Sequence, residues 1–121
     1  MNLRTRLWLR CDGHCEKCGI QLGYDWAMHH RKLKSRGGKD EITNVVALHH
    51  HCHNLGSDSV HLNVREATER GYIVNSWDEP GRVPLLMADD TLVLLTELDG
   101  YEIVGRADHG WSGDSRRAGW A

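Results

Sequence analysis

Two pairs of potential metal ligands, each separated by two residues, constrain the fold of this chain more than any other feature. The first pair is Cys15 and Cys18, followed at once by a glycine, which is the spacing of a zinc knuckle whose two thiolates converge on one ion. The second pair, His49 and Cys52, repeats the spacing with a histidine in place of one cysteine. We therefore expect Cys15, Cys18, His49 and Cys52 to bind one structural zinc ion in a closed Cys3His tetrahedron, which contributes folding energy directly.

Two other ligand sets compete with this assignment. Cys11 could replace His49 as the fourth ligand, although a buried free thiol is the simpler interpretation of that cysteine. Alternatively, His49 and His53 are four residues apart and could share a helix face, binding one ion with no separate structural zinc. All four cysteines lie in the first half of the chain and we see no secretory leader, so we expect metal binding in a reducing cytoplasm rather than disulfides.

Length and composition predict a soluble globular protein. The chain has 121 residues, enough for one ordinary domain or one small domain with an appendage. No apolar run approaches the roughly twenty residues that a membrane span needs. The net charge of −2 conceals an asymmetry, because residues 1–75 hold eleven Lys and Arg against eight Asp and Glu, whereas residues 76–121 hold four against nine. The acidic average therefore does not exclude a polyanionic partner for the N-terminal part.

Local patterns predict a small α+β fold of short elements. Hydrophobic periodicity indicates helices, β-branched apolar runs indicate strands, and paired aspartates or Asp-Gly indicate turns. Asn63 is expected to cap a helix, with Glu66 completing a capping box. The expected helices cover residues 2–10 and 65–70, and the expected strands cover residues 24–31, 44–48, 83–87, 91–98 and 101–104.

These elements divide the chain into three expected parts. Residues 1–75 form a zinc-containing domain, which is too small to be comfortably stable on its hydrophobic core alone. Residues 76–106 form a β-rich extension with a short hairpin at Asp99-Gly100. Residues 107–121 are rich in Gly, Ser and Arg and are expected to form a poorly ordered tail. We expect the tryptophans at positions 8, 26 and 77 to be core residues rather than platforms for base stacking.

Six of the nine histidines lie between residues 29 and 53. His29 and His30 are neighbours on a predicted strand, so their side chains point to different sides and cannot easily chelate one ion together. This favours one metal ligand and one general base, since imidazole titrates near physiological pH. His53 directly follows Cys52 and would point about 100° away from it on a helical turn. We interpret His14, His50, His51 and His61 as surface or supporting polar residues, and we do not expect His61 or Asp58 to add a metal ligand.

Five motifs in a fixed order carry a resemblance to a known family. They are Cys15-x2-Cys18, His29-His30-Arg31, Gly37-Gly38, residues 44–48 and Cys52-His53. In this order, over about residues 10 to 75, they resemble the HNH endonucleases of the zinc-bearing kind that is common in phage genomes. The resemblance implies a zinc-stabilised ββα-metal core, similar to a treble clef, and metal-dependent hydrolysis of DNA.

The resemblance also implies roles for individual residues. His30 matches the histidine that deprotonates the attacking water, and Asn44 matches the asparagine that fixes the loop between the strands and helps to orient His30. His29 and His53 match the ligands of a catalytic divalent ion, although His29 stands where most members have an aspartate. That departure moves the expected preference from Mg²⁺ toward Mn²⁺, Ni²⁺ or Zn²⁺, which accept imidazole. His49 departs from the usual cysteine of the second pair and leaves the zinc assignment open.

A run of cations lies beside these histidines. Such runs are usually solvated turns, but the position of this one between the expected active-site residues favours contacts with DNA phosphates. The cations are Arg31, Lys32, Lys34, Arg36 and Lys39. The resemblance makes DNA the expected partner and phage packaging proteins candidate further partners, in the host cytoplasm, and no membrane partner is expected. A non-catalytic treble-clef zinc module that binds DNA or a protein is the main rival, because it shares the cysteines without requiring His30, Asn44 or His53.

Overall fold

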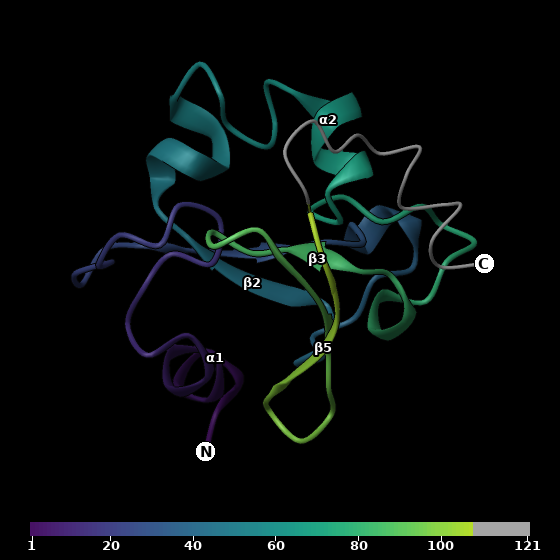
Figure 1. Cartoon of the computed structure of the whole chain (residues 1–121), viewed down its shortest axis with the longest axis horizontal. Helices are drawn as coiled ribbons and strands as arrows, with labels where there is room; N and C mark the ends of the chain where they lie inside the picture. The colour runs from purple at the N-terminus through teal and green to yellow at the C-terminus, as the bar shows by residue number, and fades with distance from the viewer. Residues whose placement is uncertain (108–121) are drawn as a thin grey trace.

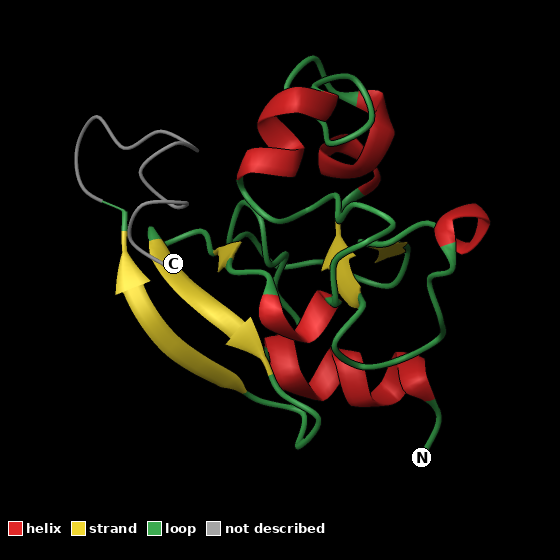
Figure 2. Cartoon of the chain, turned by 90° about the vertical axis from the view of Figure 1, so that its right-hand side faces the viewer, coloured by secondary structure: helices red, strands yellow, loops and turns green. Residues whose placement is uncertain are grey.

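The computed structural model describes residues 1–107, so apart from its first residue the tail expected over residues 107–121 lies outside the described residues. The described part is a small α+β fold with two antiparallel sheets (Figure 1; Figure 2). Its elements are α1 (Leu3–Cys11), β1 (Ala27–His30), η1 (Lys34–Arg36), β2 (Val45–Leu48), η2 (His51–Leu55), α2 (Val64–Glu69), η3 (Pro80–Arg82), β3 (Leu85–Leu86), β4 (Thr91–Leu95) and β5 (Tyr101–Arg106). None of the helices among these residues is long and apolar enough to cross a membrane.

A two-stranded hairpin lies at the centre of the fold. β1 and β2 pair antiparallel, with His29 opposite Val46 and His30 opposite Val45. Because directly opposed residues share a face and successive residues alternate, His29 and His30 lie on opposite faces of the hairpin. In both views η2 and α2 lie on one side of the hairpin and α1 lies on the other (Figure 1; Figure 2).

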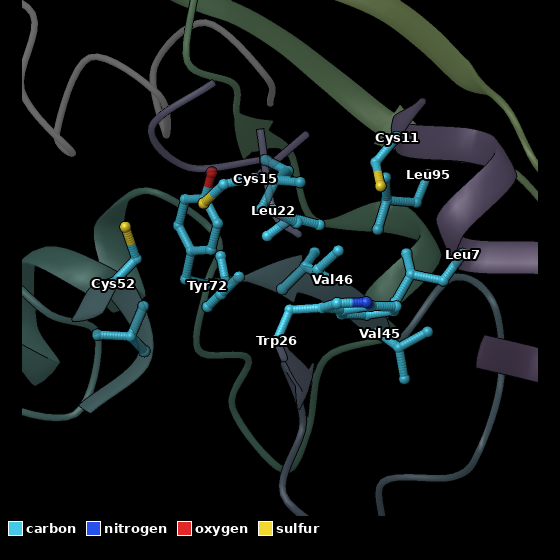
Figure 3. Packing of buried hydrophobic residues seen from close by; sticks show 14 of the residues in the cluster. Leu7, Cys11, Cys15, Leu22, Trp26, Val45, Val46, Cys52, Tyr72 and Leu95 are labelled. Carbon is cyan, nitrogen blue, oxygen red and sulfur yellow. The ribbon is translucent and has the colours of Figure 1, made fainter. Parts of the chain in front are cut away.

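One hydrophobic core connects the hairpin to the C-terminal sheet. The core contains Leu7 of α1, Val45 of β2 and Tyr72, together with Val93 and Leu95 of β4. Figure 3 shows several of these side chains in the cluster. The second sheet has the order β3-β4-β5. The core therefore continues across residue 75, the position at which the sequence suggested the extension begins.

A buried ionic network ties α1, the first cysteine pair and β5 together. The guanidinium of Arg10 donates to both carboxylate oxygens of Glu16, at 3.1 and 2.9 Å, and to the main-chain oxygens of Ile42 and Val45. The hydroxyl of Tyr101 donates to the same carboxylate. A buried charge is costly unless it is paired and hydrogen-bonded, and here both charges are. The pair holds the chain around Cys15 against the hairpin.

Three expectations about local structure were wrong in part. Asn63 occupies the N-cap position of α2 as expected, but its side chain makes no capping bond, because its amide nitrogen donates to the main-chain oxygens of Ser57 and Ser59 and anchors the preceding loop. The turn between β4 and β5 covers residues 96–100 rather than two residues. Trp26 is buried as expected, but Trp8 and Trp77 are 36% and 80% exposed.

Candidate metal centres and active site

The first candidate metal centre joins the knuckle turn to the end of the hairpin. Ligand atoms of Cys15, Cys18, His49 and Cys52 all lie within 4.8 Å of one another. The amide of Cys18 donates to the sulfur of Cys15 at 3.4 Å, and the amide of Gly19 donates to the carbonyl of Cys15 at 2.8 Å. Gly19 has a φ of +81°, a conformation that favours glycine. The turn therefore holds both sulfurs on the side that faces His49 and Cys52.

The orientation of His49 suits a metal ligand. Its Nε2 lies 2.9 Å from the carbonyl oxygen of Gln21, so Nε2 donates and Nδ1 is left with a free lone pair. Nδ1 lies 3.3 Å from the sulfur of Cys18. Cys11 lies outside this group, where its buried thiol donates to the carbonyl of Trp8. The donor set of three thiols and one imidazole is that of a structural zinc site.

Two of the three thiols in this group ionise less readily than a free thiol. Burial, reinforced by the neighbouring thiols, raises the pKa of Cys52, and burial raises the pKa of Cys18 in the same way. A thiolate is the form that binds metal, so an ion offsets the cost of gathering these charges in one place. The residues therefore fit a zinc ion, and such an ion would join the first twenty residues to the end of β2.

The second candidate centre consists of three histidines. Ligand atoms of His29, His53 and His61 lie within 4.8 Å of one another, and the Nε2 atoms of His53 and His61 are 3.0 Å apart. His61 was not expected to add a ligand, but its ring lies within reach of the other two. The amide of Val60 donates to the carbonyl of Cys52, and the amide of His61 to that of His53, so the intervening loop folds back and returns His61 to the group.

His29 is held ready to act as a neutral ligand. It is 2% exposed, and its Nε2 donates to the carbonyl oxygen of Tyr72 at 2.6 Å, which leaves Nδ1 with the free lone pair. Burial lowers the pKa of His29 to about 3, and burial also lowers the pKa of His53. Both imidazoles are therefore neutral at physiological pH, which is the form that binds metal.

The two centres meet at η2, which is a single π-helical turn. Such turns are rare and frequently occur at functional sites. Here Cys52 belongs to the group of three cysteines and His49, whereas the next residue, His53, belongs to the group of three histidines. Adjacent residues on this turn thus serve two different sites, so the position of one centre depends on the other.

His30 lies outside both groups. Its Nε2 is 2.7 Å from the carboxylate of Asp40, so Nε2 donates and Nδ1 is the nitrogen that can accept a proton. The hydrogen bond from His30, followed by that from Lys34, lowers the pKa of Asp40 below its usual value. The sequence analysis did not identify Asp40. Its position in the loop after Gly37-Gly38, rather than any recognisable spacing, brings it to His30.

Asn44 fixes the loop that follows β1. It is fully buried, its carboxamide oxygen accepts from the amide of Lys32 at 2.8 Å, and its nitrogen donates to the carbonyls of Lys32 and Lys39. The amide of Arg31 donates to the main-chain oxygen of Asn44 at 2.8 Å. Asn44 therefore closes both ends of the loop that carries Asp40, immediately after His30.

The cations of this loop have different environments. Lys34, Arg36 and Lys39 are exposed, and the ammonium of Lys32 donates to the carbonyl of Asp78 at 3.2 Å. Arg31 is 0% exposed and its guanidinium donates to four main-chain carbonyls from three other segments. The expectation that Arg31 contacts phosphate was therefore wrong, because its side chain is enclosed and its donors are already used.

A comparison with known families agrees with this geometry. The family model described as HNH endonuclease matches residues 15–59, a range that begins at the first cysteine of the knuckle and includes His29, His30, Asn44 and His53. No curated protein and no solved structure matches the chain. The matched segment contains the hairpin, the first candidate metal centre and two members of the second. Over residues 15–59 this chain is therefore similar to the HNH endonuclease family.

Proposed function

We propose that this protein is a metal-dependent DNA endonuclease in which His30 activates the water that attacks a phosphodiester. The observation that carries the proposal is that two adjacent residues at the end of β1 have different environments: His29 belongs to the three-histidine group, whereas His30 belongs to neither metal group and pairs with Asp40. We place the scissile phosphate at this end of the strand, with the ion on one side and His30 on the other. The match of residues 15–59 to the HNH endonuclease family supports it. The resemblance to phage members of the family supports a role in the processing of phage or mobile-element DNA in a host cytoplasm.

In this proposal His29, His53 and His61 hold one divalent ion. Three imidazole nitrogens favour Mn²⁺, Ni²⁺ or Zn²⁺ over Mg²⁺, which prefers oxygen ligands. When bound, the ion would supply Lewis-acid stabilisation of the negative charge that develops on the phosphate and the leaving oxygen. Because the neutral form of His29 is enforced by burial, this ligand does not have to lose a proton before it binds.

His30 acts on the water. Its Nδ1 takes one proton as the water oxygen forms a new bond to phosphorus and the bond to the 3′-oxygen breaks. Asp40 accepts the hydrogen bond from Nε2, which fixes the tautomer and the ring orientation and stabilises the imidazolium that forms. A general base of this kind contributes about 10² to 10⁴ in rate.

The surrounding residues position these groups and the substrate. The zinc bound by Cys15, Cys18, His49 and Cys52 would fix η2, and Asn44 fixes the loop after His30. The exposed cations Lys34, Arg36 and Lys39 continue from the active histidine along that loop and would contact the phosphates of the substrate strand. We assign nuclease function to residues 1–75, with residues 76–106 as an extension that completes the core.

Cleavage of supercoiled plasmid tests the proposal. Wild-type protein, His30→Ala and His50→Ala are incubated with Mg²⁺, Mn²⁺ or Ni²⁺. His50 is a suitable control because it is a partly exposed histidine that pairs with Asp25 and belongs to neither metal group. We expect metal-dependent nicking by wild type and His50→Ala, and a rate lower by about 10² to 10⁴ for His30→Ala.

Two results would contradict the proposal. Absence of divalent-dependent nicking by the wild-type protein would favour the non-catalytic zinc module, which needs one tightly bound ion and no second metal. Equal cleavage by wild type and His30→Ala would remove His30 from the mechanism.

A further inference from the structure

An aromatic pocket lies between α1 and the segment that leads into β1, away from the three-histidine group. It has a volume of about 410 Å³, and its lining includes Arg4, Trp8, Gly23, Tyr24 and Trp26. Among the described residues, no carboxylate lines it. Neither candidate metal centre uses any of these side chains.

The guanidinium of Arg4 lies over one of the indole rings of this pocket. The carbon at the centre of the Arg4 guanidinium lies 3.7 Å from the centroid of the Trp26 ring, and the same group donates to the carbonyl of Trp26 at 3.0 Å. Trp8 packs beside Trp26 with ring centroids 6.0 Å apart. Trp26 is buried, while Arg4 and Trp8 are exposed on the outer side. The arrangement presents a planar cation stacked on one indole and flanked by a second.

Tyr24 stands at the rim of the pocket with its side chain fully exposed. A fully exposed tyrosine covers no core, so burial does not explain its place. Gly23 beside it has open space where a side chain would project, which leaves the pocket accessible to a flat ligand. Aromatic rings interleaved with arginine form the usual surface for stacking unpaired bases.

The pocket and His30 lie at the two ends of β1. Trp26, which lines the pocket, immediately precedes the strand, and His30 is the last residue of the strand. Four residues of strand span about 13 Å, a distance that a few nucleotides cover. A DNA strand whose phosphate lies at His30 can therefore place a nearby base in the pocket.

We propose that this pocket binds an unpaired nucleobase of the substrate strand, so that the enzyme prefers DNA with a single-stranded segment beside the cleavage site. The proposal rests on the nuclease function proposed above. A nucleobase offers a flat, uncharged ring to the aromatic side chains, and its phosphates complement Arg4. A cationic ligand or a basic peptide is disfavoured because Arg4 lines the pocket and none of the other described lining residues carries a carboxylate.

The test compares two single strands that differ only in their bases. Binding of a short oligothymidylate and of an abasic strand of equal length is measured with the zinc-loaded full chain, without added divalent ions. We use wild type, Tyr24→Ala and Leu98→Ala, because Leu98 is an equally exposed apolar residue in the β4–β5 turn. Stacking predicts that wild type and Leu98→Ala bind oligothymidylate about 5- to 150-fold more tightly than the abasic strand, and that Tyr24→Ala loses most of this preference.

Equal affinity of the wild-type protein for the two strands would overturn the proposal, as would a preference that Tyr24→Ala retains in full. Equal affinity would indicate that only phosphates are bound. A preference retained by Tyr24→Ala would indicate that bases stack elsewhere. Because Tyr24 covers no core, its replacement leaves the fold intact. The binding assay requires no cleavage, so its failure is distinct from a failure of the plasmid assay, which tests the nuclease function itself.

Discussion

Replacing Arg31 by methionine separates a structural role for this residue from the phosphate contact that its position in the sequence suggests. Its guanidinium is fully buried and donates at 2.7 Å to the carbonyl of Gly71, at 3.0 and 2.8 Å to those of Thr43 and Pro80, and at 2.7 Å to that of Val83. The carbonyls belong to the hairpin loop and to the C-terminal half of the chain. Arg31 therefore connects residues 1–75 to the extension.

The expected loss of stability follows from these hydrogen bonds. A hydrogen bond to a charged group contributes about 1.5–3 kcal/mol, but such values are not additive within one network, and methionine retains part of the packing. We expect Arg31→Met to lower the free energy of unfolding by about 3–5 kcal/mol, a large part of the roughly 5–15 kcal/mol that a domain possesses. Arg36→Met, at an exposed position of the same loop, should change it by about 0.5 kcal/mol or less.

Urea unfolding measures the change in stability. The salt dependence of duplex DNA binding measures whether either arginine contacts a phosphate. Each phosphate contact contributes about 0.9 to the slope of log K against log salt. Arg36→Met should reduce that slope by about this amount, whereas folded Arg31→Met should retain it. A stable Arg31→Met protein with a reduced slope would refute the structural assignment and restore the phosphate contact.

Three further predictions concern the metal centres and the loop. Cys18→Ser should release the structural zinc, measured by elemental analysis, and should also weaken the second metal centre, because η2 carries ligands of both; retention of a full zinc equivalent would contradict this. His61→Ala should weaken binding of the activating divalent ion by about 10- to 100-fold, measured as the Mn²⁺ concentration for half-maximal nicking, and an unchanged value would exclude it as a ligand. Asn44→Ala should lower the free energy of unfolding by about 2–4 kcal/mol, because the main-chain groups that Asn44 bonds would lose their partner, and it should lower the nicking rate of the folded protein. A variant with wild-type stability and rate would show that the loop does not need this amide.

The sequence alone was enough to predict the hairpin and the grouping of cysteines, because these depend on local patterns. A β-branched run at residues 44–48 and the repeated two-residue spacing around Cys18 and Cys52 leave few alternatives. The structure brings the predicted zinc ligands within reach of one another and places Cys11 elsewhere. The role of each residue in catalysis remains a prediction that the experiments above address.

The residues that sequence reasoning misplaced depend on tertiary contacts. His61 joins His53 only because two main-chain hydrogen bonds close the loop between them, and no periodicity encodes that closure. Arg31 belongs to a run of cations with the same composition as exposed neighbours such as Lys34, and only the approach of residues 71–83 buries it. Asn63 is a residue type that often caps helices and stands at the N-cap of α2, but its side-chain amide holds the preceding loop.

Anomalous diffraction from crystals of the zinc-loaded protein soaked in Mn²⁺ tests the central claim most directly. The claim is that one histidine-rich segment is divided between a structural zinc and a second, reactive ion, while His30 stays free of metal. It predicts a peak at the zinc edge among Cys15, Cys18, His49 and Cys52, and a separate manganese peak among His29, His53 and His61. A manganese ion bound by His30, or the absence of any ion at the three histidines, would contradict it.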